Sequence, residues 1–484
     1  MPIANFLPTT ADYVRFLPEL LLTLAGVLIM FLEALRPEGH KSNAGLFAIV
    51  ALVMALPAAL LATPGPAFQG MLMVDGMATF FRTLVVVVGL LVVFSSTDYL
   101  RRENQESGEF YALVLFSIVG QCVMVTANEL VMIFIGLEIS SIASYILAGY
   151  LRDDARNNEA ALKYFLLGSF ATAFLLYGVA WMYGATGSTN LTEIRRALIS
   201  GAAPPDALIG VAAALIFVGL AFKISAAPFQ GWAPDVYQGA PAPVSAFLTV
   251  GPKAAAFAVL MRVFLGSLEP IASPWALAVW VCALATMVVG NFGAIMQSNI
   301  KRLLAYSSIA HAGYVLVAVA ANSGIGSAAA MFYLAAYAFT NIGAFAVVTY
   351  FSRKGEGYVS IDDFAGLAQR QPGIAAMMTI FLLSLIGVPL TGGFFGKFYI
   401  FKAALDANLI WLTVLGLLNS AVAAYYYLRI LVVMYMREPG ASVEKLPPAG
   451  ALLQIAVYGS AAGTLLLGIF PSLVLDFANR AALR

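Results

Sequence analysis

The sequence predicts an all-α polytopic membrane protein with about 14 transmembrane helices, two inverted five-helix repeats, and breaks in helices 7 and 12. Three observations lead to this fold class. First, 61% of the 484 residues are hydrophobic and 11% are charged, whereas a soluble domain carries about 25% charged residues. Second, the hydrophobic residues gather in runs close to the ~20 residues that a helix needs to cross a bilayer. Third, two of these runs are interrupted by prolines and glycines beside a lysine.

The apolar runs give the order of the expected helices along the chain. Each run is long enough for one crossing, and some of the longer ones include turns at the membrane surface. The expected spans are 11–35, 42–63, 73–97, 110–127, 129–150, 157–184, 206–226, 240–266, 274–296, 301–320, 327–352, 373–402, 405–436 and 451–475.

The lysines and arginines between these helices predict the orientation. The basic residues in one set of alternate loops are Arg36, Lys41, Arg101, Arg102, Arg152, Arg156, Lys301, Arg302, Arg353, Lys354, Arg370, Arg437 and Lys445. Those of the opposite loops and the C-terminus are Arg195, Arg196, Arg480 and Arg484. The richer side is expected in the cytoplasm, which places both termini on the outer side. The stretch LTEIRRAL, which holds Arg195, is expected to form a short amphipathic helix on the outer surface.

Two regions, 226–243 and 387–397, break the helical pattern. Proline removes a backbone donor and clashes with the preceding turn, so a helix cannot run through them unchanged. Broken backbone inside a membrane persists only where protein or a water-filled cavity satisfies it. Paired breaks in two halves are typical of inverted-repeat transporters. The units expected on this basis are 1–109 (helices 1–3), 110–266 (helices 4–8), 267–437 (helices 9–13) and 438–484 (helix 14).

Composition and motifs exclude several classes of function. The formal net charge of +1 provides no footprint for a nucleic acid. The two cysteines lie in separate apolar runs and lack iron–sulfur spacing, and the two histidines are too few for a metal site of their own. No GxGxxG motif follows a strand pattern, so no nucleotide or flavin site is indicated.

Glu138 is the acidic residue expected deepest in the membrane, within ELVMIFIGLEISSIASYILAGY. A carboxylate there needs a cation to offset the cost of losing water. Lys223, at the first break, is its first candidate partner. The alternative is a purely structural ion pair that holds two helices together.

Further ionisable residues stand at mid-membrane or close to it. Lys163 lies four residues after Glu159, so the two share a helix face and can pair, either as part of a relay or as an interfacial salt bridge. Lys253 and Lys397 follow the prolines and glycines of the two breaks, and a lysine in hydrocarbon costs roughly 3 kcal/mol. The alternative for the lysines of the first break is that they snorkel to an interface.

His311 is the last candidate, and its side chain is suited to relaying protons near neutral pH, although a satisfied core histidine is the alternative. Lysine gives up a proton readily on burial, whereas arginine stays charged. The row of Glu138, lysines and His311 therefore suits proton transfer through intervening water. We interpret the membrane arginines Arg82 and Arg262 as structural or snorkelling, and Asp75 and Asp235 remain unassigned.

Four stretches resemble the proton-translocating membrane family of respiratory complex I and the Mrp-type cation/proton antiporters. They are GLEISSIASYIL at 136–147, FKISAAPFQGWAPDVYQGAPAPVSAFLTVGPK ending at Lys253, NIKRLLAYSSIAHAGY at 299–314, and GVPLTGGFFGKFYIF at 387–401. Within the family, the chain resembles bacterial members with fourteen helices and no long C-terminal lateral helix. Lys397 distinguishes it from a related subunit that carries glutamate at the same position.

The resemblance implies a role in proton translocation within an NADH-quinone oxidoreductase. On that basis the proton path consists of Glu138, Lys163, Lys223, Lys253, His311 and Lys397. It implies no cofactor on this chain, with FMN, iron–sulfur clusters and quinone in partner subunits. The implied partners are other antiporter-like membrane subunits, the peripheral flavin and iron–sulfur arm, and lipids. The implied location is the bacterial inner membrane, with both termini in the periplasm.

Two alternatives remain. A Mrp-type Na⁺/H⁺ antiporter subunit could use the same buried charges. A sodium site needs several oxygen ligands at mid-membrane, however, and Glu138 alone provides few of them. A non-transporting scaffold, in which the charges only fix helix packing, is the second. Neutralising the lysines of a scaffold would harm assembly and spare coupling.

Overall fold

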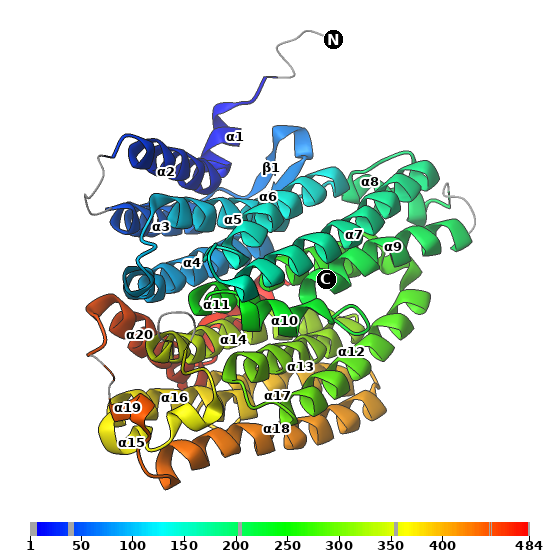
Figure 1. Ribbon diagram of the computed structural model, residues 1–484. Helices are drawn as coiled ribbons and strands as arrows, with labels where there is room; N and C mark the ends of the chain where they lie inside the picture. The colour runs from blue at the N-terminus through cyan, green and yellow to red at the C-terminus, as the bar shows by residue number, and fades with distance from the viewer. Residues whose placement is uncertain are drawn as a thin grey trace.

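The computed structural model describes residues 7–36, 43–201, 206–352, 357–444, 446 and 448–482. A helix occupies each of the fourteen expected spans, and the helices lie side by side in a bundle (Figure 1). Twelve of the described helices are long and apolar enough to cross a membrane. The basic loop residues Lys41, Arg353, Lys354, Lys445 and Arg484 lie outside the described residues.

The helices that fill the expected spans follow in chain order. They are α2 (Leu17–Ala34), α3 (Ala44–Leu60), α4 (Gly76–Glu103), α5 (Gly108–Thr126), α6 (Leu130–Ala148), α7 (Ala155–Thr186), α9 (Asp206–Ile224), α11 (Ala242–Met261), α12 (Ala272–Ile295), α13 (Ile300–Ala320), α14 (Gly324–Phe351), the pair α16 (Pro372–Ile386) and α17 (Gly392–Asp406), α18 (Ile410–Met436) and α20 (Ala451–Ile469).

The structure corrects the expectation in three places. A two-stranded antiparallel hairpin, β1 (Gly65–Ala67) with β2 (Leu72–Val74), joins α3 to α4. The twelfth span is two helices, and its break covers only the residues between Ile386 and Gly392. Within 226–243, a short helix α10 (Trp232–Gly239) re-forms between the break and α11. The stretch LTEIRRAL does form a helix, α8 (Leu191–Ile199).

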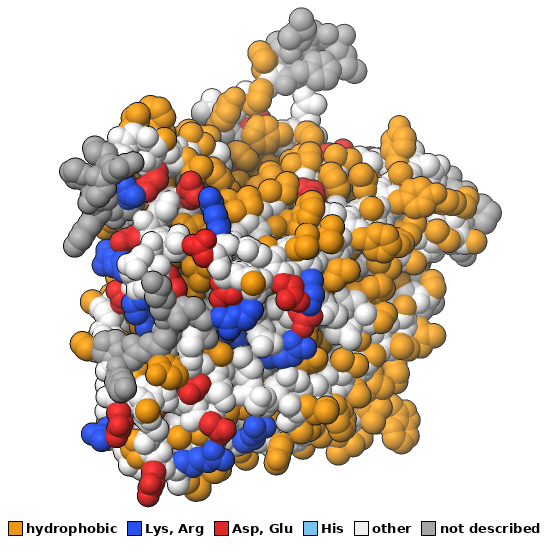
Figure 2. Space-filling view, in the orientation of Figure 1, with side chains coloured by type: hydrophobic (Ala, Val, Ile, Leu, Met, Phe, Trp, Pro, Cys, Tyr) orange, Lys and Arg blue, Asp and Glu red, His pale blue; other side chains and the backbone are white. Residues whose placement is uncertain are grey.

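Three helices make up the centre of the bundle. Every residue of α11 is buried, and α13 and α14 are almost wholly buried. The outer helices α2, α7 and α18 instead expose large apolar side chains, as expected for surfaces that face lipid. In Figure 2 the charged side chains gather on the left and centre of the view, and the rest is mostly hydrophobic.

Matching backbone pairings occur in the two expected halves. Before α6, Leu130 N donates to Thr189 O (2.9 Å) and Leu191 N donates to Asn128 O (2.9 Å). Before α13, Ile300 N donates to Val359 O (2.8 Å) and Ile361 N donates to Ser298 O (2.9 Å).

Helix packing is also alike in the two halves. A Cβ at Gly120 of α5 would lie 2.4 Å from Ser140 N of α6, and one at Gly290 of α12 would lie 2.4 Å from Ala310 N of α13. Both features favour the repeat, which stays a prediction together with the domain boundaries.

Candidate functional site

The first break places Lys223 in the last turn of α9. The helix ends at Ile224, Ser225 has a left-handed φ of 60°, and the chain resumes as α10. Lys223 is 4% exposed, which rules out snorkelling. Its Nζ donates to Ser141 Oγ (2.8 Å) and to the Tyr164 hydroxyl (3.2 Å).

Glu138 and Lys223 do not form the direct ion pair expected from the sequence. Ser141, which accepts the hydrogen bond from Lys223, lies three residues after Glu138 on α6, so Glu138 and Ser141 project from one helix face. Glu138 and Lys223 interact electrostatically, but Glu138 Oε1 is buried without a hydrogen-bond partner. A buried carboxylate oxygen of this kind normally has a partner, so a bridging water fits here.

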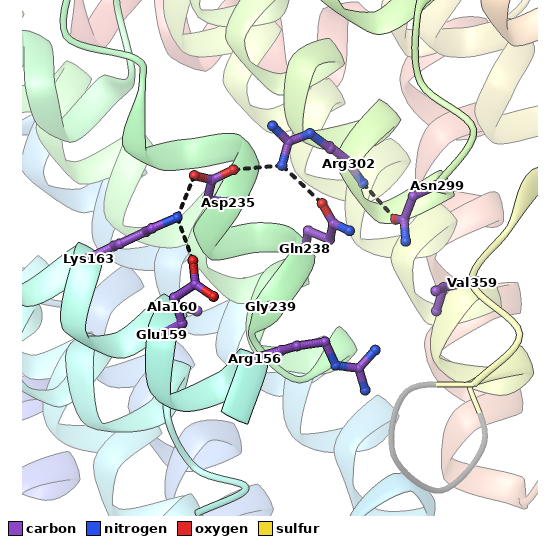
Figure 3. Close-up of a pocket in the computed structure, with 10 residues that line it drawn as sticks. All are labelled: Arg156, Glu159, Ala160, Lys163, Asp235, Gln238, Gly239, Asn299, Arg302 and Val359. Carbon is purple, nitrogen blue, oxygen red and sulfur yellow. Dashed lines mark hydrogen bonds and ion pairs between the residues drawn. The ribbon is translucent and has the colours of Figure 1, made fainter. Parts of the chain in front are cut away.

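Lys163 is one of five charged side chains that line a polar cavity of about 210 Å³ (Figure 3). Its Nζ contacts Glu159 Oε1 at 2.7 Å, which confirms the expected pair on α7. It also contacts Asp235 Oδ2 of α10 at 2.9 Å. Arg302 of α13 reaches the other oxygen of Asp235 at 2.6 Å.

Asp235 therefore joins α7 to α13 through α10. Burial raises the pKa of this carboxyl, but the hydrogen bonds from Lys163 and Arg302 outweigh it and hold the pKa below its usual range. The sequence alone gives no role to Asp235. Its partners Lys163 and Arg302 are 72 and 67 residues away in the chain, so only the fold shows that both bind it.

Lys253 lies on the fully buried α11 and is 2% exposed. Its Nζ donates to Ser308 O (3.2 Å) and to Ser308 Oγ of α13. One turn earlier, Thr249 accepts a hydrogen bond from the Asn341 side chain (2.6 Å). Asn341 Oδ1 and Gln121 Oε1 are buried without partners among the described residues, so the surroundings of this lysine contain free acceptors for water.

His311 of α13 is held at both ring nitrogens. Nδ1 is 2.6 Å from the Tyr333 hydroxyl of α14, and Nε2 is 3.2 Å from the Tyr427 hydroxyl of α18. The ring is 5% exposed and lies within electrostatic reach of Lys253 and Lys397.

Lys397 is bound at the second break. Its Nζ donates to Leu385 O (3.0 Å), Ile386 O (2.8 Å) and Ser420 Oγ (2.7 Å), and it lies 4.9 Å from the centre of the Tyr314 ring. The two carbonyls end α16, where they have no partner within the helix and carry the negative end of its dipole. The break thus creates the site that stabilises the buried ammonium.

Arg82 and Arg262, which we interpret from the sequence as structural or snorkelling, are both in ion pairs. Arg82 of α4 is wholly buried against Glu19 of α2, at 2.7 Å, so it does not snorkel. Arg262 contacts Asp75 at 2.8 Å. Both pairs lie outside the row that runs from Lys163 to Lys397.

The chain is similar to several known proteins over nearly its whole length. The family described as NADH:quinone oxidoreductase/Mrp antiporter matches residues 127–423. NADH-quinone oxidoreductase subunit N 1 of Solibacter usitatus is 63% identical over 473 residues, 97% of each chain. Subunit N of Trichlorobacter lovleyi is 43% identical over 96% of each.

Two solved structures have similar folds. A chain of respiratory complex I from Thermus thermophilus aligns with a TM-score of 0.81 at 35% identity, covering 96% of this chain and 99% of that one. A chain of the Mrp complex from Dietzia aligns with a TM-score of 0.85 at 22% identity, covering 98% and 97%. At that identity the second likeness concerns the fold alone.

Proposed function

Because the chain belongs to the NADH:quinone oxidoreductase/Mrp antiporter membrane family, we propose that it is a proton-translocating membrane subunit of an NADH-quinone oxidoreductase. The observation that carries this function is the 63% identity to a subunit N across 97% of both chains. The row of ionisable side chains, four of them buried, supplies the physical means.

We assign the proton path to Glu138, Lys163, Lys223, Lys253, His311 and Lys397. Lys163 lines the polar cavity and is the most exposed of the four lysines, with 41% of its side chain accessible, so it is suited to exchange protons with water. The three deeper lysines are held by hydroxyls and carbonyls. Glu138, one turn before Ser141 on α6, adds a negative charge near Lys223. Waters at the unpartnered oxygens bridge the gaps.

The redox chemistry belongs to partner subunits in this proposal. FMN, iron–sulfur clusters and quinone are assigned to them, and this chain binds and moves protons. Its partners are the other membrane subunits and the peripheral arm of the complex, together with surrounding lipids. The location is the bacterial inner membrane, with both termini in the periplasm, because the basic loops favour the opposite side.

The test is ion counting on the purified, reconstituted complex. Flavin and iron–sulfur subunits should co-purify with this chain, and NADH oxidation should translocate protons without sodium. Glu138→Gln should lower the protons moved per NADH, while Glu109→Gln, an exposed carboxylate paired with Arg152, should not. Sodium counterflow in place of proton pumping would favour the Mrp-type alternative and contradict this function.

A further inference from the structure

We propose that Tyr427 and Tyr333 are proton-carrying residues, and that protons enter and leave the His311 ring only through their two hydroxyls. The inference deepens the proposed function and rests on it. It assigns a catalytic part to two tyrosines that the resemblance to the family does not cover.

Both ring nitrogens of His311 already contact a tyrosine hydroxyl. One ring nitrogen contacts the Tyr333 hydroxyl at 2.6 Å and the other contacts the Tyr427 hydroxyl at 3.2 Å. A neutral imidazole has one donor and one acceptor nitrogen. With a phenol on each, His311 has no free nitrogen to offer to a water molecule.

The space beside the His311 ring is too small for a chain of water molecules. The cavity beside His311, between Tyr333, Tyr337 and Ser384, holds about 10 Å³. A water molecule needs roughly 10–15 Å³ by the same measure, so the cavity has room for one water at most. The face of the ring is covered by Tyr337, whose ring centre lies 5.0 Å away. On this side of His311 the described residues leave no room for a file of waters.

Each of the two tyrosines contacts a residue that is next in the chain to a lysine or to a residue that binds one. On one side, the Tyr427 hydroxyl hydrogen-bonds Ser307 Oγ, and the next residue, Ser308, accepts from Lys253. On the other side, the Tyr333 ring packs against α17 at Gly396, where an added Cβ would meet Tyr333 Cδ2 at 2.7 Å. Gly396 directly precedes Lys397. The row Tyr427–His311–Tyr333 therefore begins one residue from Ser308, which binds Lys253, and ends against the residue that precedes Lys397.

The transfer conserves protons at every atom. In one tautomer the Tyr427 O–H donates to Nε2, and Nδ1–H donates to the Tyr333 oxygen. A proton that arrives at the Tyr427 oxygen sends the phenolic proton to Nε2. Nδ1 then gives its proton to the Tyr333 oxygen, which releases its own toward Lys397. One proton has moved, no group keeps a net charge, and His311 has changed tautomer. The reverse direction uses the same atoms.

The experiment uses the complete reconstituted complex and removes single hydroxyls. Tyr427→Phe and Tyr333→Phe keep ring and packing. The matched control is Tyr111→Phe, because the Tyr111 ring is equally buried but its hydroxyl contacts Thr97 Oγ1 (3.5 Å) and not His311. His311→Leu gives the reference for a blocked path. The readouts are subunit content, protons translocated per NADH, and the D₂O effect on coupled turnover.

We expect Tyr427→Phe and Tyr333→Phe to slow coupled proton translocation by about tenfold or more, as for the loss of a positioned proton-transfer group. They should match His311→Leu, the double variant Tyr427→Phe/His311→Leu should be no worse, and the D₂O effect should grow. Tyr111→Phe should behave as the unmodified chain.

Three outcomes would overturn the inference. Full translocation in either hydroxyl-deleted variant, with His311→Leu impaired, would mean that water serves the ring, and the proposed function would stand. An equal loss in Tyr111→Phe would mean that loss of any buried tyrosine hydroxyl is responsible. Normal pumping in His311→Leu would remove His311 itself from the path. Should Tyr427→Phe fail to assemble, Tyr333→Phe decides.

Discussion

Lys223, Lys253 and Lys397 share a mode of binding that their sequence context does not reveal. Each is buried, yet none forms an ion pair with a described residue, and neutral oxygens hold each ammonium. A carboxylate favours the charged form of a lysine, whereas hydroxyl and carbonyl oxygens can hold the ammonium and let the neutral amine form. Lys163, with two carboxylates, differs from the other three.

Lys253→Arg separates a relay from a scaffold. Arginine keeps the positive charge but does not lose its proton in a protein, so a relay fails and a scaffold is preserved. We expect normal subunit content and clearly reduced proton pumping per NADH. The matched control is Lys402→Arg, an exposed lysine paired with Asp406, which should be neutral. Full pumping with arginine at 253 would remove this residue from the path.

The buried titratable residues can be predicted from the sequence, whereas the residues that bind them cannot. A lysine or a glutamate in an apolar run can be recognised from the sequence, because charged residues are rare in such runs. A tyrosine is common there, and the chain has 21 tyrosines, so none of them is conspicuous. Tyr333 and Tyr427 lie 22 and 116 residues from His311, so only the fold reveals them.

At the scale of elements, the two breaks have different chemistry. The first ends α9 just after its own lysine. The second ends α16 so that its carbonyls face a lysine from the next helix. Prolines and glycines predicted both breaks, but the short α10 and the hairpin Gly65–Val74 were missed, because very short elements depend on contacts outside their own sequence.

Gly387→Ala tests the second break. Gly387 has a φ of 96°, where a Cβ costs about 1–2 kcal/mol, and that Cβ would lie 3.0 Å from Lys397 Cδ. We expect lower thermal stability of the purified complex and weaker pumping. Gly459→Ala, on a helix with open space around it, should be harmless. Equal stability and pumping in both variants would show that the break does not position Lys397.

At the scale of the whole molecule, α10 connects the two predicted halves. Lys163 of α7, in the first predicted half, and Arg302 of α13, in the second, both bind Asp235. Lys301, beside Arg302, donates to Ala240 O at the end of α10 (2.5 Å). The sequence indicated two halves from paired breaks, but it could not show which residues join them, because this contact depends on tertiary packing.

A double-mutant cycle on Lys163→Gln and Arg302→Gln tests that connection. The two cations share one carboxylate, so their effects on coupled turnover should be strongly non-additive, and Asp235→Asn should resemble the double variant. The control is Arg370→Gln, which loses only an exposed contact with Glu444. Additive effects, or normal turnover in Asp235→Asn, would show that α10 works without this link.

The pair of Glu19 and Arg82 has a consequence for biosynthesis. The two residues are 63 positions apart in the chain, so the ribosome delivers the acid well before the base. Until α4 has been inserted, α2 carries a carboxylate that only water at the membrane surface can solvate. Removing one member of a buried pair costs roughly 3–5 kcal/mol, and the nascent chain is in that state. The contact of α2 with α4 through this pair can therefore form only after the helix that brings Arg82 has been inserted.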